Sequence, residues 1–203
     1  MAATCAFGLS GPAAAADITG EAIIEWWANE VDLDTGAGSM DAGALGGHVD
    51  VWFGAWGAKL SVFDSELDTL TERDASFFSV DIKRRLVSVT DNNYLALGLG
   101  WEDIDLALGD SSSGVRLVAE GQFAPLPILH LYGQIAWMPE LSDAGGRTDL
   151  EGREWEIGAA LTPFPFLSLR GGWRQFDLDF RRGEGGKGSS KSSGPIFGAG
   201  VHW

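Results

Sequence analysis

Apolar and polar residues alternate along most of this chain, and a period of two is the pattern of half-buried β-strands. Between residues 115 and 123, one face carries, in order, Val115, Leu117, Ala119, Gly121 and Phe123. The same alternation recurs from one part of the chain to the next. We therefore expect ten strands, at about residues 18–29, 44–53, 58–67, 75–89, 94–108, 114–123, 129–138, 152–162, 167–181 and 195–203.

The connections between the expected strands are short and long in turn. The short ones lie at 54–57, 90–93, 124–127 and 162–165, and the long ones, rich in Asp, Glu, Gly and Ser, at about 30–43, 64–74, 103–113, 139–151 and 183–194. A membrane β-barrel has short turns at one end and longer loops at the other. The predicted fold is all-β, a closed antiparallel up-and-down transmembrane β-barrel of ten strands formed by residues 17–203. Because residues 21–30 alternate poorly and could form a helical turn, eight strands is the alternative.

One segment is repeated, and both copies contain a change of phase. Residues 94–108 resemble residues 166–180, and after the Trp of each copy the apolar residues occupy the phase that was polar before it. A β-bulge near Asp103 and Gln175 would explain this change. Strands that leave the membrane there and pack their apolar side chains on themselves would explain it equally. Aromatic girdles mark membrane interfaces, and the predicted interface aromatics are Trp101, Trp137, Trp155 and Trp173.

The polar face of the strands mixes small residues with charges of both signs. This suits the interior of a narrow membrane barrel better than the wetted surface of a soluble β-sandwich, the rival fold. Because an isolated buried charge is costly, we expect these side chains to form ion pairs. The predicted lumen charge network is Asp81, Lys83, Arg85, Glu102, Arg116, Glu120, His130, Glu154, Glu156, Arg170 and Arg174, and the same face carries Glu21, Glu25, His48, Asp50, Lys59 and Gln134. The expected cross-strand pairs are Glu154 or Glu156 with Arg170 or Arg174, and Arg116 or Glu120 with His130 or Gln134.

Composition narrows the function classes. The formal net charge of −15 argues against nucleic acid as a partner, because phosphate binding needs a basic surface. The chain has no run of about 18 apolar residues, so no ordinary membrane-spanning helix is expected. Residues 1–16 carry no charge and end in a run of alanines, which is typical of a secretory cleavage site. Since the positive n-region is missing, we interpret 1–16 as a truncated signal peptide, the alternative being that it is no signal. The single cysteine, Cys5, falls within it.

Three features of the sequence resemble those of a family of small Gram-negative outer-membrane β-barrel proteins. They are the start Asp17-Ile18-Thr19-Gly20, Trp27 ahead of Asp34-Thr35-Gly36, and the ending Gly194–Trp203. In outer-membrane proteins, such an ending resembles the signal read by the barrel-assembly machinery, here Phe197, Ala199, Val201 and Trp203. Phe is the commoner last residue of that signal, so the Trp is a departure. The resemblance implies an outer-membrane location, a monomer, and the lipid bilayer, lipopolysaccharide and the assembly machinery as partners.

The sequence predicts no catalytic residue, no metal site and no cofactor. The histidines are His48, His130 and His202, and no nucleophile motif accompanies them. Paired charges would fill the interior of so narrow a barrel. The expected function is therefore that of an integral outer-membrane protein with a plugged lumen and a structural or surface-interaction role. A small passive channel is the alternative, and a lipid-modifying enzyme is the third hypothesis.

Overall fold

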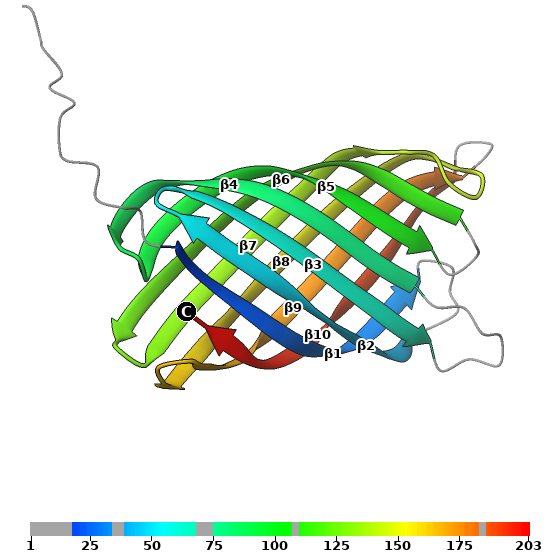
Figure 1. Cartoon of the computed structure of the whole chain (residues 1–203). Helices are drawn as coiled ribbons and strands as arrows, with labels where there is room; N and C mark the ends of the chain where they lie inside the picture. The colour runs from blue at the N-terminus through cyan, green and yellow to red at the C-terminus, as the bar shows by residue number, and fades with distance from the viewer. Residues whose placement is uncertain (1–17, 34–38, 68–74, 107–109, 183–185) are drawn as a thin grey trace, which may run out of the picture.

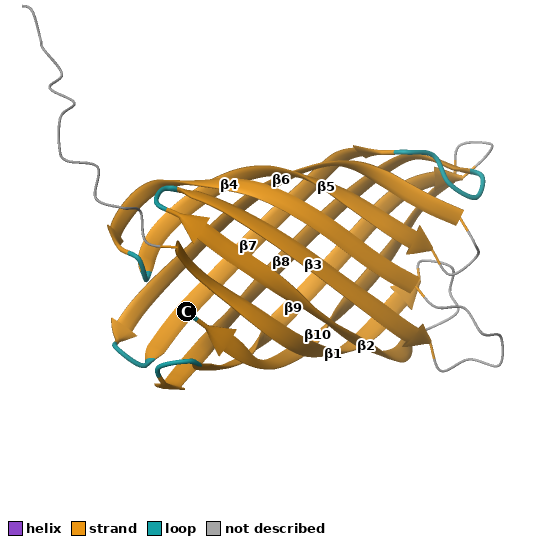
Figure 2. Cartoon of the chain, viewed as in Figure 1, coloured by secondary structure: helices purple, strands orange, loops and turns teal. Residues whose placement is uncertain are grey.

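Ten antiparallel strands form one closed sheet in the computed structural model, which describes residues 18–33, 39–67, 75–106, 110–182 and 186–203 (Figure 1). The strands are β1 (Ile18–Leu33), β2 (Ser39–Phe53), β3 (Trp56–Leu67), β4 (Ala75–Thr90), β5 (Asn93–Leu106), β6 (Asp110–Leu126), β7 (Leu129–Leu141), β8 (Arg147–Phe164), β9 (Leu167–Arg182) and β10 (Gly186–His202) (Figure 2). Each strand pairs with its neighbours in sequence, and β1 pairs with β10 to close the barrel. The predicted all-β fold and its ten strands are confirmed, and residues 21–30 are strand rather than helix.

The two ends of the barrel differ. Two-residue turns at 54–55, 91–92, 127–128 and 165–166 lie at one end, which also holds the start of β1 and the chain's last residue (Figure 1). We call this the short-turn end and the opposite one the long-loop end. Among the described residues, no helix is long and apolar enough to span a membrane. The predicted signal peptide, residues 1–16, lies outside the described residues.

Several strands reach further toward the long-loop end than their apolar pattern predicted. The clearest case is β10, which begins at Gly186 rather than at residue 195, so that Lys187 and Lys191 belong to a strand. Backbone pairing with β9 continues without interruption from Gly186 to Val201. Ladder hydrogen bonds join backbone groups, so a Gly/Ser-rich segment can pair with a neighbouring strand although its side chains do not favour one. For this reason the predicted long connection at 183–194 is wrong.

The strands reverse their polarity partway along the barrel. Near the short-turn end the apolar side chains of β5 face outward, and Leu97 and Leu99 are 49% and 57% exposed. Beyond Trp101 the exposed residue is Asp103, whereas Ile104 points inward and is 1% exposed. The register continues unbroken through Asp103 and also through Gln175 of β9, so the predicted bulge is wrong. The apolar side chains there pack inside the barrel, as the alternative explanation expected. That the strands leave the membrane at this point stays a prediction.

These inward apolar side chains form a cluster that fills the barrel near the long-loop end. The cluster consists of Trp27, Ala44, Phe63, Ile104, Met138, Leu141, Leu150, Phe176, Leu178, Phe180 and Ile196, with Phe77 packed against it. Among the described residues, every strand except β6 contributes to it. Aromatic rings meet edge to face within it, as Phe77 and Phe176 do at 5.2 Å between centroids. Fully burying one such side chain stabilises a fold by about 1.5–3 kcal/mol. The long-loop part of the barrel thus has an apolar core.

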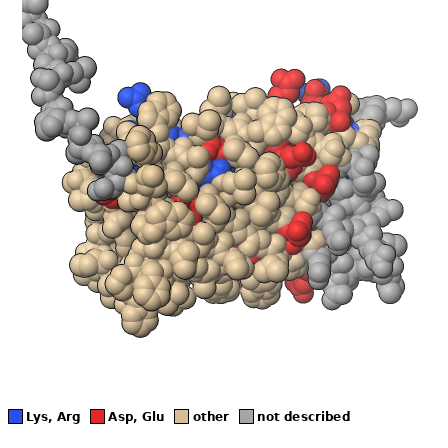
Figure 3. All heavy atoms as spheres, viewed as in Figure 1, with Lys and Arg blue, Asp and Glu red and all other residues tan. Residues whose placement is uncertain are grey.

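A belt of outward apolar residues surrounds the rest of the barrel, with aromatic residues at both margins. Trp101, Trp137 and Trp173 are 48%, 47% and 44% exposed, and Trp155 lies half-buried on the same outer face. Exposed aromatics near the other margin include Phe53, Trp56, Phe164, Phe166 and Trp203. Figure 3 shows this largely uncharged surface, with acidic side chains gathered toward the long-loop end at the right.

The C-terminal residue joins the first strand directly. Gly20 and Trp203 exchange two backbone hydrogen bonds, of 3.1 and 3.0 Å, and the Trp203 indole lies against the Gly20 Cα. The predicted assembly residues Phe197, Ala199, Val201 and Trp203 all point outward from β10 and the chain end. Their role as an assembly signal stays a prediction.

Closure at this seam predicts a difference between two glycines. A Cβ at Gly20 would come within 2.6 Å of the Trp203 ring and 2.7 Å of the Asp50 carbonyl oxygen, whereas at Gly171 the nearest atom would be 3.7 Å away. Gly20→Ala should therefore lower the free energy of unfolding by about 1–3 kcal/mol, the usual cost of overpacking. Gly171→Ala is the matched control and should be neutral or slightly stabilising. Urea unfolding in lipid vesicles, followed by Trp fluorescence, measures both, and equal midpoints would contradict the packing at the seam.

Candidate functional site

Charged side chains occupy the interior between the apolar cluster and the short-turn end. Alternation places them there, because every second residue of a strand points inward. The inward acids are Glu21, Glu25, Asp50, Asp81, Glu102, Glu120, Glu154 and Glu156, and the inward cations are Lys59, Lys83, Arg85, Arg116, Arg170 and Arg174. Acids outnumber cations in this set. Glycine, alanine and serine at neighbouring inward positions leave room for the long side chains.

The first cluster is centred on Arg116 of β6, which is 2% exposed. Its Nη1 donates hydrogen bonds of 2.6 Å to both Glu102 and Glu154, and its Nε lies 3.3 Å from Asp81 Oδ1. Glu154 also pairs with Arg174 at 3.0 Å, and the Arg174 guanidinium lies over the ring of Phe63 at 4.1 Å. Arg174 thus connects the ionic cluster to the apolar cluster, which lies nearer the long-loop end.

A second cluster surrounds Lys83 of β4. Its ammonium donates hydrogen bonds of 2.7 Å to Asp50 and 2.8 Å to Glu120. Tyr94 donates a hydrogen bond of 3.1 Å to the other oxygen of Glu120. Both carboxylates and the ammonium are at most 9% exposed at the side chain, so one buried cation is shared between two buried acids.

The third cluster joins β1, β2 and β9 around His48. Its ring nitrogens lie 3.1 Å from Glu25 and 3.2 Å from Glu21. Arg170 donates a hydrogen bond of 2.8 Å to Glu21, and its guanidinium stacks on Tyr132 at 3.9 Å from the ring centroid. His48 is therefore held between two carboxylates.

The cross-strand pairs expected from the sequence are only partly present. Glu154 pairs with Arg174, and Glu156 lies 3.8 Å from Arg170. Glu120 does lie opposite Gln134 in the β6–β7 register, but in the described structure Arg116 and Glu120 pair with charged residues rather than with their neutral β7 neighbours. Arg116 pairs with Glu102 of β5 and Glu154 of β8, and Glu120 pairs with Lys83 of β4. The neighbours bond elsewhere: Lys59 donates to Gln134 at 2.8 Å, and His130 Nδ1 lies 2.9 Å from Gln122 Nε2.

Trp27, Trp52, Tyr94 and Tyr132 complete the interior. Tyr132 shares the polar phase of His130 and Gln134 and was expected there, whereas the other three were not predicted to lie inside. Trp52 shares its phase with His48 and Asp50, so the period of two does place it inside. Trp27 likewise shares its phase with Glu21 and Glu25, whereas Trp26 has the opposite phase and is exposed.

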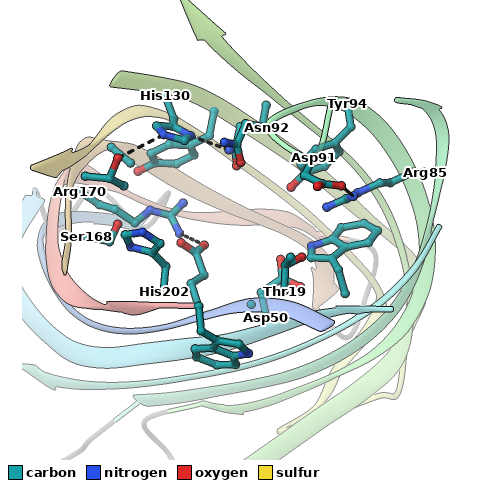
Figure 4. A pocket seen from close by; sticks show the side chains of 18 of the residues that line it. Thr19, Asp50, Arg85, Asp91, Asn92, Tyr94, His130, Ser168, Arg170 and His202 are labelled. Carbon is teal, nitrogen blue, oxygen red and sulfur yellow. Dashed lines mark hydrogen bonds and ion pairs between the residues drawn. The ribbon is translucent and has the colours of Figure 1, made fainter. Parts of the chain in front are cut away.

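A cavity of about 360 Å³ opens at the short-turn end of the lumen (Figure 4). Arg85 and Asp91 lie on one side of it, and Arg170, Ser168 and His202 lie on the other. His130 also lines it, and its Nε2 is 3.4 Å from Thr162 Oγ1, which is long for a hydrogen bond. Within the described ranges, no group of three or more His, Cys, Asp or Glu side chains is arranged to hold a metal ion.

One charged group on the outer surface is fixed beyond the Trp girdle. Arg153 donates hydrogen bonds of 3.1 and 2.8 Å to Glu151, and Trp137 donates one of 2.9 Å to the same oxygen. These bonds favour the charged carboxylate and hold the pKa of Glu151 below its usual value. This pair lies at the surface, in contrast to the ion pairs buried in the lumen.

Comparison with known proteins identifies the architecture. No family model and no curated protein sequence matches this chain. The solved structure of the outer membrane protease OmpT from Escherichia coli is similar, with a TM-score of 0.56, 10% sequence identity, and coverage of 92% of this chain and 96% of that one. At that identity the likeness shows the fold alone.

Two further solved structures align less closely. One is an anion-selective porin from Comamonas acidovorans, with a TM-score of 0.36, 13% identity, and coverage of 85% of this chain and 58% of that one. The other is Ail from Yersinia pestis, with a TM-score of 0.34, 11% identity, and coverage of 92% of this chain and 99% of that one. The likeness to the outer membrane protease shows the fold, and this chain has a β-barrel fold of the kind found in the outer membrane.

The Arg116 cluster predicts a large loss of stability when its cation is removed. Arg116→Met would leave the buried carboxylates of Asp81, Glu102 and Glu154 with too few partners, and breaking a buried ion pair costs about 3–5 kcal/mol. Unfolding midpoints in guanidinium chloride, measured in vesicles, give the change. Adding Glu102→Gln to the variant should recover part of the loss.

The exposed pair on the outer surface supplies the control for this prediction. Arg153→Met breaks the bonds to Glu151 and should leave the midpoint unchanged, because exposed ion pairs contribute little. Equal effects of Arg116→Met and Arg153→Met would show that the lumenal network does not stabilise the barrel.

Proposed function

We propose that this chain is an integral outer-membrane protein with a closed lumen, and that it has a structural or surface-interaction role. The observation that carries the proposal is the filled interior: paired charges occupy the lumen and an apolar cluster lies across its long-loop part. A protein built in this way presents its long-loop end on a rigid support and offers solutes no open path.

The outer surface supports placement in a bilayer. Leu97, Ile135 and Ile157 are 49%, 61% and 60% exposed and belong to a belt that encircles the barrel. Exposed apolar patches of such extent are rare on soluble monomers and mark a contact with lipid or protein. Because the barrel is closed, no strand edge has unpaired backbone groups within the belt, which the hydrocarbon requires. A monomer can therefore span the bilayer without a partner chain to cover a strand edge.

The reversal of polarity sets the outer boundary of the membrane in this proposal. Up to Trp101 and Trp173 the barrel is apolar outside and polar inside, and beyond them it is polar outside and apolar inside. The second arrangement is that of a protein in water. The long-loop part would then stand above the bilayer, beside the headgroups of lipopolysaccharide, and the short turns would face the periplasm as they do in such barrels.

A small passive channel is the second candidate. The cavity at the short-turn end favours it, since it forms an aqueous entrance to the lumen. In the structure this entrance leads to the Lys83 and Arg116 clusters, and the apolar cluster lies behind them. Conduction would therefore require the ion pairs to separate and the apolar residues to move apart.

Conductance in planar bilayers distinguishes the two candidates. The purified full chain, shown to be folded by heat-modifiable migration on SDS gels, should give no steady current steps, because buried ion pairs and apolar side chains occupy its lumen. An established porin reconstituted in the same bilayers is the positive control. Steady, reproducible steps from the wild-type protein would overturn the closed-lumen proposal and favour the channel.

Orientation in the membrane is tested by cysteine labelling in a Cys5→Ser background. Asp143 lies in the connection at the long-loop end and Asn92 in a turn at the short-turn end, and both are exposed. A membrane-impermeant maleimide should label Asp143→Cys, but not Asn92→Cys, on intact cells that produce the protein. Both variants should react after lysis. Labelling of Asn92→Cys alone on intact cells would reverse the orientation, and equal reaction of both would contradict an outer-membrane location.

A further inference from the structure

Arg85 differs from the other buried cations of the lumen in where its counterion lies. Its side chain is 6% exposed, and the carboxylate paired with it, Asp91, is 75% exposed and belongs to a turn at the barrel mouth. The bond between them is 3.2 Å long. Lys83 and Arg116, in contrast, each pair with carboxylates inside the barrel. Arg85 is a buried charge whose partner is accessible to solvent.

The guanidinium of Arg85 is positioned by aromatic rings. It lies 4.2 Å from the ring centroid of Trp52 and 4.6 Å from that of Tyr94, and the two centroids are 5.2 Å apart. It therefore occupies the corner between the two rings, which fix its plane. Its Nε is buried and has no hydrogen-bond partner among the described residues. A fixed guanidinium fork with a free edge matches the geometry of a carboxylate.

The space in front of Arg85 is large enough for a small molecule. The cavity of about 360 Å³ lies within the range of ligand pockets, about 300–1,000 Å³. Asp50 lines the same cavity, and its Oδ1 is buried without a hydrogen-bond partner in the described structure. Gln122 and His130 add neutral polar groups to the wall. Arg170 and Glu21 also line the cavity, but they pair with each other at 2.8 Å. Beside that pair, the cavity offers the guanidinium of Arg85 and the carboxylate of Asp50.

We propose that this cavity is a binding site for a small monocarboxylate that carries a hydrogen-bond donor, such as an amino acid, entering from the short-turn end. The carboxylate displaces Asp91 from Arg85, and the donor group faces Asp50. A dianion is disfavoured, because Arg170, the second guanidinium of the cavity, is already paired with Glu21, and carboxylates outnumber cations along the lumen. The site goes beyond the proposed function and does not require a closed or an open lumen.

Calorimetric titration of the folded full chain in detergent micelles tests the site, with alanine, propionate and inorganic phosphate as probes. Alanine should bind most tightly, propionate more weakly, and phosphate least. Arg85→Gln should weaken alanine binding at least about 10-fold, the effect of losing a hydrogen bond to a charged group. Asp91→Asn should tighten it, because the competing carboxylate is gone.

Arg84→Gln is the matched control. Arg84 neighbours Arg85 on β4 but lies on the outer face, over the Trp56 ring at 5.5 Å, and its loss should not change binding. If Arg85→Gln does not fold, the alanine affinity of Asp91→Asn is compared with those of the wild type and Arg84→Gln, and this comparison decides the question. The proposal is overturned if the wild type binds no carboxylate, if phosphate binds more tightly than alanine, if Arg85→Gln binds as the wild type does, or if Asp91→Asn leaves the affinity unchanged.

Discussion

The pairing of β1 with β10 is the constraint on which the rest of this structure depends. It runs from Glu21 opposite His202 to Leu33 opposite Ser190, and backbone hydrogen bonds between Gly20 and Trp203 extend it to the last residue. Without it, two strands would have free edges, and a free edge exposes unpaired backbone groups that hydrocarbon does not solvate. Once the sheet is closed, every side chain must point either into the lumen or out of it, so the alternation along each strand becomes a division between two environments.

The lumen is narrow, and its width brings charged side chains of different strands within reach of one another. Long side chains such as those of Arg116, Lys83 and Arg170 reach carboxylates on other strands, where each buried charge meets an opposite one. Arg174 has a double role, because it pairs with Glu154 on one side and lies over Phe63 on the other. The ionic and apolar parts of the interior are thus in contact, with no need for a water layer between them.

The sequence was sufficient for the fold but only partly for the interior. A period of two assigns a residue to the inside or the outside, and on that basis Arg116, Glu102 and Glu154 were expected within one lumen. It places Glu120 opposite Gln134 of β7, as observed, but it gives no position around the barrel axis, and for that reason it did not predict the ion pairs of Arg116 and Glu120 with β4, β5 and β8. Strand ends were also missed where composition misleads: residues 186–194 are rich in Gly, Ser and Lys, yet they pair with β9 along their whole length.

Of the features that the sequence left open, the change of phase after Trp101 has the greatest structural consequence. A bulge would have kept the apolar residues outside and extended the apolar belt. The unbroken register instead turns Ile104, Phe176 and Leu178 inward while Asp103 and Asp179 face outward. One ladder of hydrogen bonds therefore carries two opposite arrangements of polarity, each suited to a different solvent. The apolar residues that lie inside the barrel beyond Trp101 are also the core of the part beyond the belt, so moving them apart would remove that core.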